Sequence, residues 1–203
     1  MQTKGVLVVV SGFSGAGKGT VMKALLNKYD NYALSVSATT RNPRPGEENG
    51  REYFFLTESQ FEDMIKNDEL IEHARYVDHY YGTPKKYVEE KMAAGKDVIL
   101  EIEIQGALNI KKKFPDALLV FIVPPTAEDL KKRLTGRGTE STEVIEKRLR
   151  RAAEESDGMD SYDYIVVNDD IDTCVEDLHS LIRSSHFKES ANTDLVARMK
   201  QEL

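Results

Sequence analysis

Short runs of consecutive apolar residues recur along the chain and alternate with segments of helical periodicity. Four of these runs have the length and the branched side chains of buried strands, and they occupy residues 6–10, 98–100, 118–123 and 164–167. After the first run, helical spacing over residues 21–28 places Leu25 and Leu26 on the core side. Continuous apolar strands separated by helices are typical of a parallel sheet that is covered on both faces. We therefore predict a three-layer α/β fold with a central parallel sheet.

Residues 35–86 do not follow this pattern, because they are richer in Tyr, Arg, Pro, Gly and Glu. Within them, Thr57 and Gln60 have the spacing of an N-terminal capping box, and apolar residues follow at helical spacing. We interpret this segment as a small subdomain inserted into the sheet-forming chain. The polar residues from about 188 onward are expected at the periphery, as a surface helix or a frayed end.

A glycine-rich turn joins the first predicted strand to the first helix. It has the pattern G-x-x-x-x-G-K, and its residues are Gly12, Phe13, Ser14, Gly15, Ala16, Gly17, Lys18, Gly19 and Thr20. In a turn between a strand and a helix, such residues surround a phosphate with backbone N–H groups, and the lysine adds a positive charge. We predict a binding loop for a nucleoside triphosphate. The alternative, an ordinary tight turn, would not require a lysine after its last glycine.

The same loop departs from the usual pattern at the position that ligates magnesium. Gly19 stands where Ser or Thr usually supplies a hydroxyl, and Thr20 follows one residue later. We therefore expect Mg²⁺ to be held mainly through water and the phosphates of ATP. Thr20 and Glu101 are the candidates for a direct ligand.

Composition argues against several classes of function. The chain has 203 residues and a net charge of −7, which disfavours a nucleic-acid-binding protein with a broad basic surface. Its single cysteine, Cys174, can form no internal disulfide and is expected to be a packing residue. No apolar run approaches the roughly 20 residues of a membrane span, and the first run is too short for a signal peptide. We expect a cytoplasmic enzyme without a membrane or nucleic-acid partner.

Two arginines, Arg41 and Arg44, flank a proline in a loop with further proline and glycine. Proline restricts the backbone before it, and a planar guanidinium held in an ordered loop suits a phosphate. We predict a phosphate site here. The alternative is a solvated loop with surface arginines.

A second polar group comprises Tyr53, Glu72, the turn at residues 80–83 and two glutamates that follow the second apolar run. We interpret residues 101–106 as a strand, in which alternation places Glu101 and Glu103 on one face. Carboxylates that lose water near a phosphate loop require partners, which are a metal, an arginine or the donor edge of a base. For the tyrosines, packing alone is the alternative.

Two basic stretches, residues 131–139 and 147–151, are predicted to form a pair of helices. On the second helix, Arg148 and Arg151 share a face beside an apolar stripe. The stripe consists of Ile145, Leu149 and Ala152. Glycines on both sides of Arg137 make the connection mobile, which suits a lid that closes over phosphates and offsets charge during transfer. The alternative is a solvent-exposed charged hairpin.

Together these motifs resemble those of the guanylate kinases, a family of nucleoside monophosphate kinases. The resemblance runs from about residue 5 to residue 182 and rests on several motifs in the family's order. They are residues 12–20, 35–46, 49–53, 80–83, 101–106, 133–140 and 167–170. The family carries Asp at both acidic positions after the strand, or Glu and then Asp, whereas this chain has Glu101 and Glu103.

The resemblance implies a single P-loop domain with a role for each of its parts. These are a core (residues 1–34, 87–125 and 156–187), a GMP-binding insert (35–86), an arginine-rich lid (126–155) and a peripheral tail (188–203). The residues implied to hold the GMP phosphate are Arg41, Arg44, Tyr53 and Tyr81, and those implied to contact guanine are Ser37, Glu72, Thr83 and Glu103. The implied catalytic set is Lys18, Arg41 and the lid arginines Arg133, Arg137 and Arg148. Asn168 matches a residue near the adenine of ATP.

The chemistry of guanine agrees with this resemblance. Its N1–H and N2–H₂ groups are donors that a carboxylate accepts, whereas adenine turns a lone pair toward the same position. We expect Mg²⁺-dependent transfer of the γ-phosphoryl group of ATP to GMP and dGMP, through positioning, charge stabilisation and exclusion of water.

Three alternatives stay open at this point. They are an inactive interaction domain of the same fold, a kinase for another small molecule and a nucleotide-dependent switch. The intact loop lysine argues against the first, and the predicted GMP site argues against the other two. The sequence leaves the oligomeric state open between a monomer and a homo-oligomer.

Overall fold

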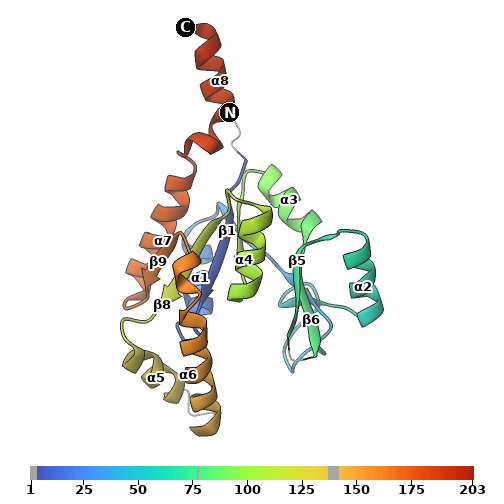
Figure 1. Ribbon diagram of the computed structural model, residues 1–203, viewed down its shortest axis with the longest axis vertical. Helices are drawn as coiled ribbons and strands as arrows, with labels where there is room; N and C mark the ends of the chain where they lie inside the picture. Colours follow the sequence, from blue (N-terminus) through green and yellow to red (C-terminus); the bar gives the residue numbers. More distant parts are fainter. Residues whose placement is uncertain (1–3, 77, 137–141) are drawn as a thin grey trace.

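The computed structural model describes residues 4–76, 78–136 and 142–203, and it has a five-stranded sheet at its centre (Figure 1). The strand order is β2-β7-β1-β8-β9, and each of these pairings is parallel. The strands are β1 (Leu7–Gly12), β2 (Tyr32–Leu34), β7 (Asp97–Glu101), β8 (Leu118–Val123) and β9 (Tyr164–Val167). This arrangement confirms the predicted α/β fold with a central parallel sheet.

Helices cover both faces of this sheet. One face packs against α1 (Lys18–Lys28) and α7 (Ile171–Ser185), and the other packs against α3 (Lys85–Ala93) and α4 (Ile104–Lys113). The central strand β1 is apolar from Leu7 to Val10 because its alternate side chains enter the two layers in turn, Val8 and Val10 in one and Val9 in the other. Burial of each such side chain contributes roughly 1.5–3 kcal/mol. Both layers therefore fix the end of β1, where the glycine-rich loop begins.

The segment between β2 and α3 forms a second sheet with the strand order β4-β3-β6-β5. Its elements are β3 (Ser37–Thr39), β4 (Tyr53–Phe55), α2 (Glu58–Lys66), β5 (Leu70–Tyr76) and β6 (His79–Pro84). The predicted capping box is confirmed: the Thr57 side chain accepts the Gln60 N–H, and the Gln60 side chain accepts the Thr57 N–H. Phe61 then packs with Ala38 and Leu70 in a small core of its own.

Two helices, α5 (Ala127–Thr135) and α6 (Thr142–Ser156), project from the carboxyl end of the central sheet (Figure 1). The predicted apolar stripe of α6 is confirmed, because Ile145, Leu149 and Ala152 pack against Leu130 and Leu134 of α5. Phe13 of the glycine-rich loop joins the same cluster. The predicted mobile connection around Arg137 and Gly138 lies outside the described residues.

Two of the predicted element boundaries differ from the structure. Residues 101–106 do not form a strand: β7 ends at Glu101 and α4 begins at Ile104, because the Glu103 carboxylate accepts the backbone N–H groups of Gln105 and Gly106 and caps the helix. At the loop, β1 continues to Gly12 beyond its apolar run, and α1 already begins at Lys18. The backbone of Gly12 still pairs with Ile122, which apolar periodicity does not reveal.

The end of the chain forms a short 3₁₀ turn and α8 (Thr193–Glu202), which extends away from the body at the top of Figure 1. Among the residues that the structure describes, none of the helices has the length and apolar character to cross a membrane. Cys174 is fully buried beside α1, and burial raises the pKa of its thiol to about 11. It is thus a packing residue, as predicted.

Candidate active site

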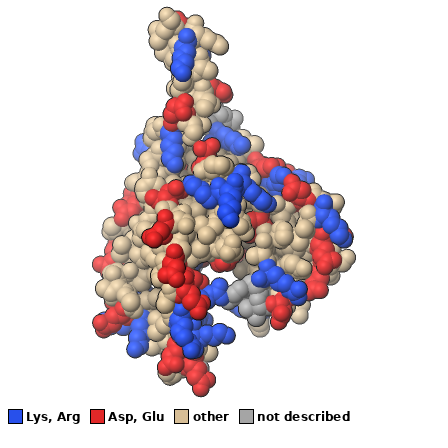
Figure 2. Space-filling view, in the orientation of Figure 1, with Lys and Arg blue, Asp and Glu red and all other residues tan. Residues whose placement is uncertain are grey.

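A cavity of about 700 Å³ opens at the carboxyl end of the central sheet. Its walls come from the glycine-rich loop, the second sheet, the start of α4 and the helix α6. Figure 2 shows a hollow between α6 and the second sheet, with basic and acidic side chains at its edges. Ligands of open parallel sheets bind at this end of the strands.

The glycine-rich loop has a backbone that L side chains rarely adopt. Gly15 and Gly17 have φ angles of 96° and 91°, and a Cβ on Gly15 would come within 2.8 Å of the Leu134 side chain. Lys18, the first residue of α1, donates to the carbonyl oxygens of Gly12 at 2.6 Å and Phe13 at 3.3 Å. Burial lowers the pKa of Lys18, whereas the charge of nearby Glu101 raises it. The loop and the helix start form an anion site with one lysine across it.

Two of the predicted lid arginines contact this loop. Arg148 donates to the hydroxyl of Ser14 at 3.1 Å, and Arg133 donates to the carbonyl oxygen of Ala16 at 3.3 Å. The second terminal nitrogen of Arg133 donates to the backbone carbonyl of Asn168 at 2.7 Å. The structure therefore brings Arg133 and Arg148 to the phosphate loop, while Arg137 lies outside the described residues.

The predicted phosphate arginines of the insert, Arg41 and Arg44, both donate hydrogen bonds to Glu47. Arg41 donates to both carboxylate oxygens of Glu47 at 3.0 Å, and its guanidinium lies over the rings of Tyr53 and Phe55. Arg44 is exposed, and its backbone N–H also donates to Glu47. Tyr53 and Tyr81 line the cavity, whereas neither guanidinium does. Glu47 is a residue that sequence analysis missed, although its spacing after Arg41 and Arg44 in a tight loop was the available signal.

At the opposite wall, Glu72 is 6 % exposed and accepts a hydrogen bond from the Thr83 hydroxyl at 2.9 Å. Burial raises the pKa of Glu72 to about 7; the bond from Thr83 acts against this, and the charge of Glu103 adds to it. Thr83 itself is fully buried and does not line the cavity, whereas Ser37 does. A buried carboxylate with spare acceptor positions is suited to bind the donor groups of a ligand.

The start of α4 lies directly beside this carboxylate. A Cβ on Gly106 would come within 3.1 Å of the Glu72 Oε2 atom, so the absence of a side chain permits the approach. Glu103 lines the same cavity, but both of its oxygens already cap the helix. The structure therefore brings Glu72 and Glu103 together at one helix N-terminus, a position that favours negative charge.

The candidates for a metal ligand are separated in the structure. Glu101, at the end of β7, lines the cavity, and burial raises its pKa while the charge of Lys18 lowers it. Thr20 is exposed and does not line the cavity. Among the described residues, no cluster of three or more His, Cys, Asp or Glu side chains is arranged to hold a metal ion.

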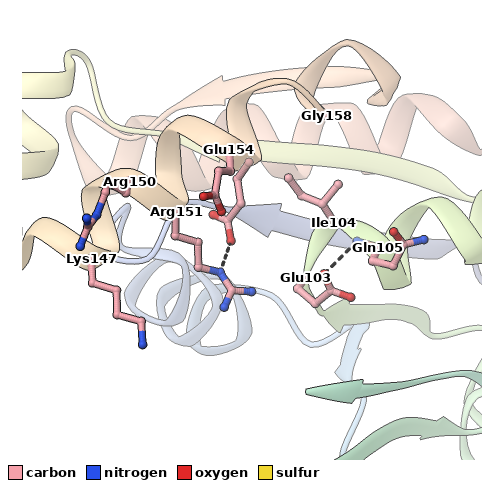
Figure 3. Close-up of a pocket in the computed structure, with 9 residues that line it drawn as sticks. Glu103, Ile104, Gln105, Lys147, Arg150, Arg151, Glu154 and Gly158 are labelled. Atoms are coloured by element: carbon pink, nitrogen blue, oxygen red, sulfur yellow. Dashed lines mark hydrogen bonds and ion pairs between the residues drawn. The ribbon is translucent and has the colours of Figure 1, made fainter. Parts of the chain in front are cut away.

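A second hollow, of about 820 Å³, continues the cavity between α6 and the start of α4 (Figure 3). Lys147, Arg150 and Arg151 line its side on α6, and Glu103 lines the opposite side. Arg151 donates to Glu155 at 2.9 Å on its own helix. Sequence analysis did not assign Glu155 to the site, and only its helical spacing from Arg151 indicated this pair.

Comparisons with known proteins identify relatives of the whole chain. A family model described as guanylate kinase matches residues 4–185. The chain is 47 % identical over 202 residues to the guanylate kinase of Caldanaerobacter subterraneus subsp. tengcongensis, an alignment that covers 100 % of this chain and 98 % of that protein. It is 49 % identical over 188 residues to the guanylate kinase of Lactococcus lactis subsp. lactis, covering 93 % and 92 %. The crystal structure of guanylate kinase from Anaplasma phagocytophilum is 32 % identical and superposes with a TM-score of 0.74, covering 92 % of this chain and 89 % of that one.

Proposed function

The chain belongs to the guanylate kinase family and is a GMP kinase, and we propose that its cavity binds GMP at Glu72 and ATP at the glycine-rich loop. The observation that carries this assignment is the buried Glu72 carboxylate, 6 % exposed, in the same cavity as the loop. A carboxylate in that position has acceptor capacity for the two adjacent donors of guanine. We place the reaction in the cytoplasm, where both nucleotides are available.

The donor triphosphate binds across the loop. Lys18 exchanges the carbonyl oxygens of Gly12 and Phe13 for phosphate oxygens, and the amides at the start of α1 bind the same anion. The proposed contact residues are those of the loop from Gly12 to Thr20. No rearrangement of the strand is required, because the two helical layers already fix its end.

The acceptor phosphate binds to Arg41, Arg44, Tyr53 and Tyr81. Glu47 holds Arg41 on the Tyr53 ring, which lines the cavity, so this guanidinium lies directly behind the wall that the phosphate would contact. Arg44 is exposed on the same loop and can swing toward the phosphate. Arg41, held by Glu47, and the exposed Arg44 would thus bind the acceptor phosphate from two directions.

The guanine base is recognised by Glu72, with Ser37 at the opposite edge. The only hydrogen of the Thr83 hydroxyl is directed to Glu72, so Ser37 is the hydroxyl that donates to guanine O6, and Thr83 holds the carboxylate in place. Glu103 faces the same base from the start of α4. Because a wrong base would leave these groups unpaired, AMP is disfavoured by about 10⁴-fold. None of these contacts involves the ribose 2′-hydroxyl, so dGMP is accepted too.

The γ-phosphoryl group of ATP is transferred in line to a phosphate oxygen of GMP. The acceptor oxygen is already anionic, so no general base is required. Lys18, Arg41 and the lid arginines Arg133, Arg137 and Arg148 offset the negative charge as it redistributes, and the closed lid excludes water. Transfer to water is consequently slow in the absence of GMP.

Magnesium is proposed as the cofactor, and the oxygen donors of the cavity fit it. The space beside Gly19 is open, since an added Cβ would meet nothing within 4 Å, but glycine has no side chain and the loop supplies no hydroxyl from this position. The ATP phosphates would supply most of the ligands of the ion, and the Glu101 carboxylate, which lines the cavity and whose charge acts on Lys18, is the proposed ligand from the protein. When bound, Mg²⁺ neutralises charge on the transferring phosphates.

Formation of ADP from ATP and Mg²⁺ tests the proposal, with GMP, dGMP, AMP, CMP and UMP compared as acceptors. We expect turnover with guanine acceptors alone, abolished in Lys18→Ala and weakened in Glu72→Gln. Turnover with another acceptor would contradict the role of Glu72. If GMP and ATP bind without turnover, the cavity serves as an interaction or switch domain instead.

A further inference from the structure

The side chain of Asn168 is buried beneath the phosphate loop. It is 3 % exposed and donates from Nδ2 to the carbonyl oxygen of Ala16 at 2.8 Å. Its backbone N–H donates to the carbonyl of Val123, which fixes the residue at the end of the sheet. Since the group that faces the side chain is an acceptor, only a donor satisfies this buried contact. The position therefore requires an amide nitrogen.

Arg133 of the predicted lid donates to the same Ala16 carbonyl oxygen. One terminal nitrogen donates to Ala16 O at 3.3 Å and the other to Asn168 O at 2.7 Å. The planar guanidinium thus joins α5, the phosphate loop and the segment after β9 through two backbone carbonyls. Both terminal nitrogens of Arg133 are thus used in contacts within the protein.

The Ala16 peptide lies between two residues with positive φ, Gly15 and Gly17. Glycines favour no single orientation of such a peptide, so the orientation has to be fixed from outside. The first turn of α1 does not use Ala16 O, because the N–H groups of Thr20 and Val21 both donate to Gly17 O. The two bonds to Ala16 O therefore fix the peptide that precedes the phosphate-binding amides. A Cβ on Gly17 would lie 2.4 Å from Asn168 Nδ2, so the contact is direct.

We propose that Asn168 and Arg133 are positioning residues that clamp the Ala16 carbonyl and hold the Gly17 and Lys18 amides in the orientation that binds the triphosphate. The inference rests on the proposed assignment of this loop to ATP. It gives Asn168 a role different from contact with adenine, because the clamp acts before any nucleotide binds.

Two substitutions at Asn168 test the clamp. Asn168→Asp keeps the shape but turns an acceptor toward the Ala16 carbonyl, and Asn168→Ala removes the donor. The matched control is Asp169→Asn, at an exposed neighbouring position. We expect hydrogen exchange of the amides of residues 15–20 in the nucleotide-free protein to accelerate by about tenfold in both Asn168 variants, as for the loss of one buried hydrogen bond. The control should not change.

Steady-state kinetics supply the second measurement. The KM for ATP should rise by about tenfold in the Asn168 variants, while the KM for GMP stays within the error of the wild-type value. Arg133→Lys keeps the charge but loses the fork, so it should accelerate exchange at the same amides by a smaller factor. This variant also tests the clamp if the Asn168 variants fail to fold, which circular dichroism would show.

Unchanged amide exchange in both Asn168 variants would overturn the clamp. So would an altered preference between ATP and GTP as donors without faster exchange, because Asn168 would then contact the base. The exchange measurement requires no substrate. Absence of GMP turnover in the wild-type protein would therefore contradict the proposed function while leaving the clamp standing.

Discussion

In the proposed function, the phosphate loop and the guanine end of the cavity recognise their ligands with different parts of the chain. We propose that the loop, residues 12–20, binds phosphate with backbone amides and one lysine. The guanine end uses side chains from separate strands of the second sheet, such as Ser37 of β3 and Glu72 of β5, and the start of α4. Backbone amides bind any phosphate of the right shape, whereas Glu72 requires a base with adjacent donors. Affinity and base selectivity are thus located in separate parts of the fold.

The two regions also differ in their electrostatics. The cations at the loop already contact oxygens of the protein, since Lys18 binds two carbonyls and Arg148 binds Ser14. Among the residues that the structure describes, the Thr83 hydroxyl is the donor to the Glu72 carboxylate, and burial raises the pKa of this carboxyl to about 7. In the proposed function, the donors of guanine would stabilise a buried carboxylate, whereas ATP would replace contacts that Lys18 and Arg148 already make. We therefore expect selectivity between bases to depend on Glu72, because its buried carboxylate is unfavourable unless a ligand donates hydrogen bonds to it.

The largest expected effect is at the loop. Lys18→Ala should lower kcat by about 10³-fold, because a preorganised charge facing the transferring phosphates is lost. The matched control, Lys23→Ala, removes an exposed lysine of the same helix and should retain wild-type kcat. Rates of ADP formation at saturating GMP measure both. A similar loss in the two variants would mean that general helix damage, rather than the site charge, is responsible.

Glu72→Gln changes the guanine end of the cavity and should affect the kinetics with GMP but not the binding of ATP. We expect kcat/KM for GMP to fall by about 10²-fold, since an amide presents a donor to a guanine donor and leaves a buried group unpaired. The KM for ATP should stay unchanged. Glu69→Gln, at an exposed position before the same strand, serves as the control. If the KM for ATP rises together with that for GMP, the two regions do not act separately.

The same substitution should make the protein more stable at high pH. The folded-state pKa of Glu72, about 7, lies above its ordinary value of 4.5, so the folded protein binds the extra proton between these values and loses stability as pH rises. Glu72→Gln removes this dependence, and its advantage over wild type should grow by about 2–3 kcal/mol from pH 5 to pH 8. Urea unfolding at both pH values measures it. An advantage that does not change with pH would show that Glu72 titrates normally.

The smallest predicted effect concerns Glu47. Glu47→Gln weakens its two bonds to Arg41 and should raise the KM for GMP by about fivefold, because the Arg41 guanidinium is then held less firmly. Glu48→Gln alters an exposed pair with Arg51 and should have no effect on this KM. Initial rates at varied GMP distinguish the variants. An equal effect of both substitutions on the KM for GMP would contradict the proposed role of Glu47 in the site.

The sequence was most informative where function and fold depend on neighbouring residues. Apolar runs predicted the central strands because β1, β7 and β8 are buried on both faces, and the capping box at Thr57 predicted the start of α2. The glycine-rich loop was predictable for the same reason, since its strand, turn and helix are contiguous. Its location at the end of a parallel strand is confirmed.

Contacts between distant residues were less accessible. Alternation suggested a strand through Glu103, but this carboxylate caps α4, a choice that depends on backbone geometry after β7. Thr83 was expected at the base, yet its hydroxyl is buried against Glu72 of a neighbouring strand. Asn168 contacts Ala16 across 152 positions of sequence, a pairing that only the fold creates. The site residues taken from the family resemblance stay predictions until the variants are measured.

The carbonyl contacts of Lys18 have a consequence for small anions. Inorganic phosphate that enters the loop must displace the bonds to Gly12 and Phe13, and it offers one group in exchange. A triphosphate displaces the same bonds but gains many further contacts along its length. These contacts would therefore make the loop discriminate by the size of the anion, and the enzyme would bind ATP in a cell rich in orthophosphate.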